Sequence, residues 1–334
     1  MRIAVDAMGG DHAPAAVVEG AALSARALGT QICLVGDPAA IQAELKAHRV
    51  ADGSITIEPA SEVVGMNEAP ARALRQKPDS SLAVAVDLVA GGQAEAVVSA
   101  GNTGAFMALA ATKLKLLPGM ERPAIAVVLP SVQGRVLLLD AGASVDCKPK
   151  MLAQFALMGS TYAERVLDVD RPRVGLLNVG EEAGKGNETV KAAYELLQSA
   201  DINFIGNAEG NHVFSGDVDV AVCDGFVGNV ALKVAEGICS LVVTVLQREL
   251  RGSLRTRLAA VLGRPALVRL AKMADYAEYG GALLLGVNGV CIIGHGRSAP
   301  KAFMNAIALA KRSVETEVLE YIRRAHSALG QEQA

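Results

Sequence analysis

Glycine-rich loops that also carry hydroxyl and amide side chains give the first sign of chemistry in this sequence. In the stretch Ser99-Ala-Gly-Asn-Thr-Gly104, hydrogen-bond donors stand beside glycines that let the backbone approach a ligand closely. A helical stretch follows, and the free N–H groups at a helix start attract anions. We therefore predict a phosphate-binding loop, with a simple capped turn as the alternative. Its residues are Ser99, Gly101, Asn102, Thr103 and Gly104.

Three further side chains are candidates for direct roles in a reaction. Lys185 stands between two glycines, where a flexible backbone can bring its ammonium group to an anion, and the alternative is a solvated surface lysine. Asn229 comes where a helix from about residue 230 is expected, so its amide either donates to an oxyanion or caps the helix. His12 either protonates a leaving group or only bonds its neighbours. We predict these three residues as catalytic.

An aspartate ends three of the short apolar runs that precede such loops. These residues are Asp6, Asp140 and Asp224. An aspartate side chain readily accepts hydrogen bonds from nearby backbone N–H groups. We predict that the three carboxylates fix the conformation of the loops that follow them.

The elements that must position these residues form one repeated unit, in which an apolar strand leads through a loop into a helix. The six strands are expected at residues 2–6, 95–98, 135–140, 173–178, 218–223 and 288–293. Alternating strands and helices predict right-handed βαβ connections and a mainly parallel sheet. We predict a three-layer, doubly wound α/β fold with all six loops at the carboxyl edge of the sheet, where such folds bind ligands.

Several well-known nucleotide-binding and catalytic motifs are absent or lack the residues that should surround them. Residues 294–299 (GHGRSA) match a dinucleotide-binding loop, but no further strand with a ribose-binding acid follows. Residues 180–186 (GEEAGKG) resemble a P-loop with one residue too few between the first two glycines. The sequence has no GxSxG elbow, and its histidines lack metal-ligand spacing. We therefore predict no metal and no cofactor, and a reaction that depends on positioning and electrostatics.

Composition narrows the class of protein. The 334-residue chain has a formal net charge of −3, which argues against a nucleic-acid binder. With 51% hydrophobic and 3% aromatic residues, it suits buried parallel strands covered by small-residue helices. Five scattered cysteines without a CxxC pair indicate reduced thiols. No signal peptide begins the chain, and no stretch reaches the roughly 18 uninterrupted apolar residues that span a bilayer, so we expect a cytoplasmic protein.

One segment differs from the rest in charge. From Arg248 to Lys272 there are seven basic residues and one acid, Glu249, a net charge of +6 that leaves −9 for the remainder. Leucines at helical spacing lie beside the arginines, namely Leu246, Leu250, Leu254 and Leu258. We predict that residues 241–273 form a projecting helical pair on a single catalytic unit of residues 1–327, with a polar tail at 328–334. Such a basic amphipathic pair suits an anionic membrane surface or an acidic protein, and the alternative is packing on the core or across a dimer interface.

Six stretches occur in the order found in one family. They are Asp6-Ala-Met-Gly-Gly-Asp-His-Ala-Pro14, Ser99-Ala-Gly-Asn-Thr-Gly-Ala105, Asp140-Ala-Gly-Ala-Ser-Val-Asp-Cys-Lys-Pro149, Gly180-Glu-Glu-Ala-Gly-Lys-Gly-Asn-Glu188, Cys223-Asp-Gly-Phe-Val-Gly-Asn229 and Tyr279-Gly-Gly-Ala-Leu-Leu-Leu-Gly-Val-Asn-Gly289. Over residues 1–323 the chain resembles the phosphate acyltransferases of bacterial phospholipid synthesis (acyl-ACP:phosphate transacylases of the PlsX type). It departs from their pattern at residues 183–184 and 293–294, both in loops.

The resemblance implies a fold like that of isopropylmalate dehydrogenases and phosphotransacylases, and a homodimer. It also implies transfer of a long-chain acyl group from acyl carrier protein to inorganic phosphate, giving acyl phosphate. Membrane contact and a downstream glycerol-3-phosphate acyltransferase are the further partners expected. The chemistry agrees with the residues, because phosphate is a competent nucleophile, a thiolate leaves readily, and orientation with oxyanion donors lowers the barrier without a metal.

Three other functions remain in competition. A short-chain phosphotransacylase that uses coenzyme A would need similar phosphate-binding groups. An NAD-dependent hydroxy-acid dehydrogenase of similar fold would need metal-binding aspartates and a nucleotide loop, which we do not find. A non-catalytic scaffold for lipid enzymes at the membrane would use only the basic segment.

Overall fold

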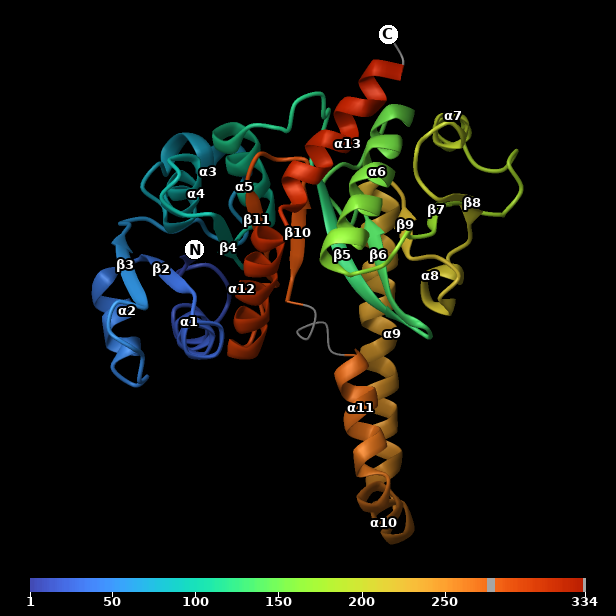
Figure 1. Cartoon of the computed structure of the whole chain (residues 1–334). Coiled ribbons are helices and arrows are strands. Elements are labelled where there is room, and N and C mark those ends of the chain that lie inside the picture. The colour runs from blue at the N-terminus through green and yellow to red at the C-terminus, as the bar shows by residue number, and fades with distance from the viewer. Residues whose placement is uncertain (275–279, 333–334) are drawn as a thin grey trace.

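One continuous sheet forms the centre of the molecule. The computed structural model describes residues 1–274 and 280–332. Within them, an 11-stranded sheet has the order β3-β2-β1-β4-β11-β10-β5-β6-β9-β7-β8 (Figure 1). The strands are β1 (Arg2–Asp6), β2 (Gln31–Gly36), β3 (Ile55–Pro59), β4 (Ala96–Ser99), β5 (Ala124–Ser131), β6 (Gly134–Leu139), β7 (Val174–Leu177), β8 (Phe204–Ala208), β9 (Val220–Val222), β10 (Ala282–Leu285) and β11 (Val290–Ile293).

Helices connect most of these strands. They are α1 (Ala15–Leu28), α2 (Pro38–Leu45), α3 (Pro70–Gln76), α4 (Ser81–Ala90), α5 (Thr103–Leu109), the π-helical turn η1 (Ala110–Leu114), α6 (Pro149–Val166), α7 (Glu188–Gln198), α8 (His212–Ser215), α9 (Gly225–Arg251), α10 (Leu254–Leu262), α11 (Arg264–Ala274), α12 (Pro300–Glu315) and α13 (Val318–Glu332). Proline stands in the first turn of α2, α3, α6 and α12, where a missing N–H leaves no helical hydrogen bond unmade.

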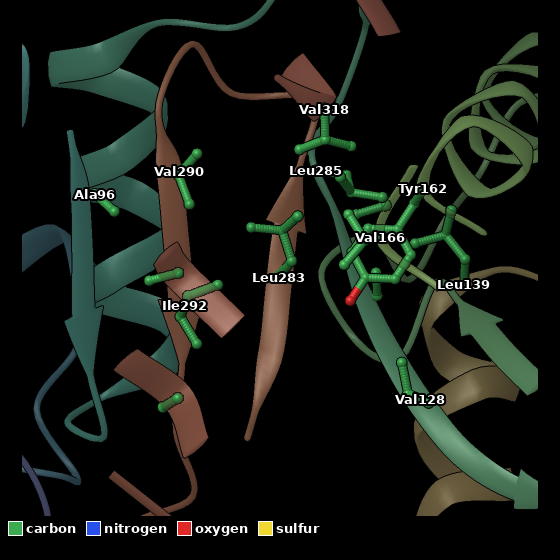
Figure 2. Packing of buried hydrophobic residues seen from close by; sticks show 14 of the residues in the cluster. Ala96, Val128, Leu139, Tyr162, Val166, Leu283, Leu285, Val290, Ile292 and Val318 are labelled. Atoms are coloured by element: carbon green, nitrogen blue, oxygen red, sulfur yellow. The ribbon is translucent and has the colours of Figure 1, made fainter. Parts of the chain in front are cut away.

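Alternation along the strands divides the core into two layers. Ile3 and Val5 of β1 face a core that α1, α6 and α12 complete, whereas Ala4 faces a second core with α4 and α5. Figure 2 shows the first core, where Leu283 of β10 and Tyr162 of α6 lie among buried strand residues. Helices on both faces of one sheet give the three-layer α/β fold that the sequence predicts.

The direction of the strands corrects one expectation. Strands β3, β2, β1, β4 and β11 are mutually parallel, and so are β6, β9, β7 and β8. Between them, β10 pairs antiparallel with β11 and with β5, and β5 pairs antiparallel with β6. The first block (β3-β2-β1-β4-β11) therefore runs opposite to the second block (β6-β9-β7-β8). The sheet is mainly parallel, but the prediction that all six loops share one edge is wrong.

Helix α9 is the longest element and leaves the body of the molecule. Together with α10 and α11 it projects away from the sheet (Figure 1), and α10 packs against both of its neighbours. By length and composition α9 would suffice to cross a membrane, with a mean hydropathy of 1.7 over its most apolar window, none of it buried. The expectation that no stretch has 18 uninterrupted apolar residues still holds for α9, because Lys233 and Glu236 lie within it.

The C-terminal expectation also changes. Helix α13 continues to Glu332, so most of the segment expected as a polar tail is helical, and residues 333–334 lie outside the described part. Tyr279, at the start of the last family stretch, is likewise outside it, as are the side chains of Leu254 and Lys272 in the basic segment.

Candidate active site

The loops of the first block are held by a buried carboxyl group. Asp6 ends β1, and its Oδ2 accepts a hydrogen bond from the Ser99 hydroxyl at 2.7 Å, while its Oδ1 accepts one from the backbone N–H of Met8 at 3.2 Å. Ser99 Oγ in turn accepts from the N–H of Gly101 at 3.0 Å. Burial raises the pKa of Asp6, against the effect of these hydrogen bonds. Asp6 thus ties the ends of β1 and β4 together.

Both polar atoms of the Asn102 side chain are hydrogen-bonded to the backbone of the protein. Its Oδ1 accepts from Ala105 N at 2.9 Å and caps α5, and its Nδ2 lies 2.8–3.1 Å from the carbonyl oxygens of Gly65, Met66 and Glu68. These contacts match the capped-turn alternative for the side chain of Asn102. The Gly101 N–H is also used, by Ser99 Oγ, so among the described residues the donors of this loop that remain free are the Thr103 hydroxyl and the N–H groups of Thr103 and Gly104 at the start of α5.

Two histidines lie at the loops of the first block. His12 is exposed, in the turn before α1, and its side chain makes no hydrogen bond to a described residue. His295 follows β11, and its Nδ1 accepts from the backbone N–H of Arg297 at 3.2 Å. Burial lowers the pKa of His295, Lys233 adds to this shift, and Glu236 opposes it. His295 therefore lies within electrostatic range of α9, which follows β9 of the second block. From the sequence, this residue stands out only as part of the rejected dinucleotide-binding motif.

In the second block, Asp140 fixes the loop after β6. Its Oδ1 accepts from the N–H groups of Ile125, Gly142 and Ala143, and its Oδ2 accepts from Ser144 N at 2.6 Å. Burial raises the pKa of Asp140 and these four donors oppose the shift. Because four backbone N–H groups donate to this one carboxyl group, the backbone conformation of the loop after β6 is fixed.

Asn229 lies inside α9 and does not begin it. The N-cap is Asp224, whose Oδ1 accepts from Val227 N at 2.8 Å, so the expected helix start near residue 230 is five residues late and Asn229 is no cap. The Asn229 side chain donates through Nδ2 to the carbonyl of Ala141 at 3.1 Å. The amide therefore lies against the loop that Asp140 fixes, with a second N–H for another acceptor.

Lys185 lies in the loop after β7, which is separated from β6 by β9 alone. Its side chain is exposed, and among the described residues its ammonium group has no hydrogen bond or ion pair. Lys185 and Asn229 thus belong to the same end of the second block, while the 99–104 loop and His12 belong to the first. Among the described residues, no hydrogen bond or ion pair joins these two groups of residues directly.

Exposed apolar side chains lie on the same segments as the polar groups of the second block. Val145 follows β6, Phe226 follows β9 and Val179 follows β7, which are neighbouring strands. Their exposed fractions are 57%, 60% and 82%. Three large apolar side chains exposed after adjacent strands, two in loops and Phe226 in the first turn of α9, are typical of a surface that binds an apolar group.

Cysteine and metal chemistry find little support among the described residues. No group of three or more His, Cys, Asp or Glu side chains in residues 1–274 and 280–332 is placed to hold a metal ion. Cys147 lies near Asp140, but burial and the neighbouring carboxylates raise its pKa to about 12, so it is a thiol at neutral pH.

Comparison with known proteins decides the family. Residues 1–321 match the family model described as fatty acid synthesis protein. The chain is 52% identical over 324 residues to a phosphate acyltransferase of Heliobacterium modesticaldum, covering 97% of both chains. It is 50% identical to a phosphate acyltransferase of Geobacter sulfurreducens, covering 97% of this chain and 91% of the relative. The chain belongs to the phosphate acyltransferase family. It is therefore an enzyme. The family also argues against the two alternatives of an NAD-dependent dehydrogenase and a non-catalytic scaffold.

Solved structures of other proteins share the fold of this chain. A phosphotransacetylase from Streptococcus pyogenes superposes with a TM-score of 0.66 at 18% identity, covering 94% of each chain. A 4-hydroxythreonine-4-phosphate dehydrogenase from Klebsiella pneumoniae gives a TM-score of 0.54 at 16% identity, covering 93% and 98%. The expected phosphotransacylase-like fold is confirmed.

Proposed function

We propose that this enzyme transfers a long-chain acyl group from an acyl carrier protein thioester to inorganic phosphate. The observation that carries the proposal is the set of side chains gathered where the parallel strands of the second block end. There, the loops after β6 and β7 and the first turns of α9, which follow adjacent strands, present the Lys185 ammonium, the Asn229 amide and the exposed apolar side chains of Val145, Phe226 and Val179. A cation, an oxyanion donor and an apolar surface are what a phosphate nucleophile and an acyl thioester require.

The reaction balances without a cofactor. A phosphate oxygen attacks the thioester carbon, the C–S bond breaks, and the proton of hydrogen phosphate ends on the carrier thiol. Lys185 draws phosphate to the site, and Asn229 donates to the oxygen that becomes negative. Holding the two reactants together supplies roughly 7–11 kcal/mol, and one oxyanion donor supplies roughly 3–4 kcal/mol. The product, an acyl phosphate, then serves a downstream glycerol-3-phosphate acyltransferase in phospholipid synthesis.

The first block has supporting roles in this proposal. The backbone N–H groups of Thr103 and Gly104, at the start of α5, contact a phosphate that this proposal places between the two blocks, where His295 of the first comes within electrostatic range of α9 of the second. Gly101 and Ser99 shape that loop through the bonds that link Gly101, Ser99 and Asp6. His12, exposed in the neighbouring loop, protonates the leaving thiolate.

Substrate length gives the sharpest test, because the fold neighbours include phosphotransacetylases and a short-chain acyl-CoA substrate is the second candidate. We expect Phe226→Ala and Val179→Ser each to lower kcat/KM for a palmitoyl carrier thioester about tenfold, the effect of losing one apolar contact surface. Activity with acetyl-CoA, if measurable, should not fall. Leu196→Ala, at an exposed leucine on α7, is the matched control. Higher kcat/KM for acetyl-CoA than for palmitoyl carrier in the wild type would select the short-chain alternative.

A second copy of the chain is the partner proposed for α9. Large apolar side chains recur along it at helical spacing and are 37–62% exposed; they are Val230, Val234, Ile238, Leu241 and Val245. A stripe of this length is unusual on a monomer and suits a symmetric helix–helix contact. We expect the wild type to elute at the mass of a dimer and the Val234→Glu, Ile238→Glu variant at that of a monomer. A monomeric wild type at micromolar concentration would exclude this interface.

The end of the projecting helices is proposed to contact an anionic membrane surface or the acidic carrier protein, while the enzyme remains cytoplasmic. On α10, Leu258, Val261 and Leu262 are 63%, 69% and 76% exposed within the basic segment. We expect the wild type to sediment with vesicles containing phosphatidylglycerol, and the Leu258→Glu, Val261→Glu variant to stay in solution. Failure of the wild type to bind, together with an affinity for carrier protein that does not change with salt, would refute both contacts.

A further inference from the structure

The loop that carries Lys185 is anchored at three successive points to the body of the second block. The side chain of Asn178, directly after β7, donates through Nδ2 to the carbonyl oxygen of Lys185 at 3.0 Å. Asn207 of β8 donates through Nδ2 to the carbonyl of Glu182 at 2.8 Å. His212 of α8 places its Nε2 3.3 Å from a carboxylate oxygen of Glu181. The tethers hold the two sides of the turn that presents the lysine.

Asn178 is itself rigidly placed. Its backbone N–H donates to the carbonyl of Ala208 at 2.8 Å and so extends the pairing of β7 with β8. Its Oδ1 accepts from the N–H of Val179 at 2.8 Å, which fixes the orientation of the amide. Through its hydrogen bond to the Lys185 carbonyl, the Asn178 side chain therefore fixes the backbone of Lys185 relative to β7 and β8.

Glycine at position 186 makes this contact feasible. Gly186 has a φ of 92°, in the left-handed region, and a Cβ built on it would lie 2.7 Å from Asn178 Oδ1. Any larger residue would displace the amide. The lysine stem packs on the other side of the turn, where a Cβ on Gly180 would lie 3.2 Å from Lys185 Cγ. Gly186 and Gly180 thus allow a close-packed turn, whereas a Cβ on Gly184 would meet open space.

Asn207 adds a second anchor from the interior. It is 7% exposed, and its Oδ1 has no hydrogen-bond partner among the described residues. Burying an amide with half of its hydrogen-bonding capacity unused costs stability. Among the described residues, the one hydrogen bond that this buried amide makes is the bond to the Glu182 carbonyl in the Lys185 loop.

We propose that Asn178 and Asn207 are positioning residues that act through Lys185, by fixing the backbone from which its ammonium group reaches the phosphate. The inference rests on the proposed role of Lys185. Orientation of reacting groups is worth a large part of the barrier, so a lysine on a loosened loop loses much of its effect although its charge remains.

A double-mutant cycle tests this directly, with the full-length protein, palmitoyl carrier thioester and inorganic phosphate. We expect Asn178→Ala to lower kcat/KM for phosphate about tenfold, and Lys185→Ala about a hundredfold. The double variant should match Lys185→Ala within about twofold, because the loop position no longer matters once the ammonium group is gone. Asn207→Ala with Lys185→Ala forms a second, independent cycle in case Asn178→Ala does not fold.

Asn203→Ala is the matched control, because the Asn203 side chain also donates to a backbone carbonyl, that of Arg171. Both residues precede their strands, β8 and β7, and so lie at the opposite end of the strands from the Lys185 loop. It should keep wild-type kinetics. A double variant about tenfold slower than Lys185→Ala would show that Asn178 acts independently of the lysine and would overturn the inference, as would normal kinetics in both asparagine variants. Normal kinetics of Lys185→Ala itself would instead remove the proposed role of the lysine, and the inference with it.

Discussion

Replacing Asn229 with alanine is expected to lower turnover about a hundredfold, the usual effect of losing one oxyanion donor. The structure separates this effect from a loss of folding. Asn229 is exposed and makes one side-chain hydrogen bond, to the Ala141 carbonyl at 3.1 Å, and it does not cap α9. Its removal should therefore cost about 1 kcal/mol of stability. Turnover and thermal unfolding of the same preparations check both expectations.

Two further variants sharpen this prediction. Asn229→Asp keeps the shape but replaces the donor with an acceptor, so it should be at least as slow as Asn229→Ala. Asn211→Ala, at another exposed asparagine of the second block, should leave turnover unchanged. Near-normal turnover of Asn229→Ala would assign the amide to loop packing alone, and a collapse of its melting temperature would make the residue structural.

Lys185→Ala is expected to lower turnover by a similar factor of about one hundred, with little change in melting temperature, because the exposed ammonium group makes no contact with a described residue. Lys185→Arg keeps the charge and should recover part of the loss. Lys191→Ala, at a lysine paired with Glu188 on the neighbouring helix α7, is the control for a general loss of positive charge. Equal losses in Lys185→Ala and Lys191→Ala would indicate long-range attraction of phosphate in place of a specific contact.

The repeated strand–loop–helix units were readable from the sequence, because apolar runs followed by Gly-rich loops mark β1, β4, β6, β7, β9 and β11. Their common direction was not. Strands β5 and β10 are mainly apolar runs, and periodicity does not say in which direction a run is paired. Since both pair antiparallel, they reverse the second block and separate loops that a purely parallel sheet would have brought to one edge.

Glycine can mark a loop or a close approach inside a helix, and the sequence alone does not distinguish these two roles. Residues 223–229 read as a loop because of Gly225 and Gly228, yet both lie in the first turns of α9. A Cβ on Gly228 would lie 1.9 Å from the Asp140 carbonyl oxygen, so this glycine permits close packing of the helix. In the same way, the sequence could not tell that Asn102 bonds a segment more than 30 residues earlier in the chain.

The central claim is tested most directly by incubating the enzyme with palmitoyl carrier protein and labelled inorganic phosphate, and then separating the products. The account predicts labelled palmitoyl phosphate in equal amount to the carrier thiol released, only when phosphate is present, and undiminished by a metal chelator. Loss of the thioester at the same rate without phosphate, or release of thiol without a labelled acyl product, would contradict it.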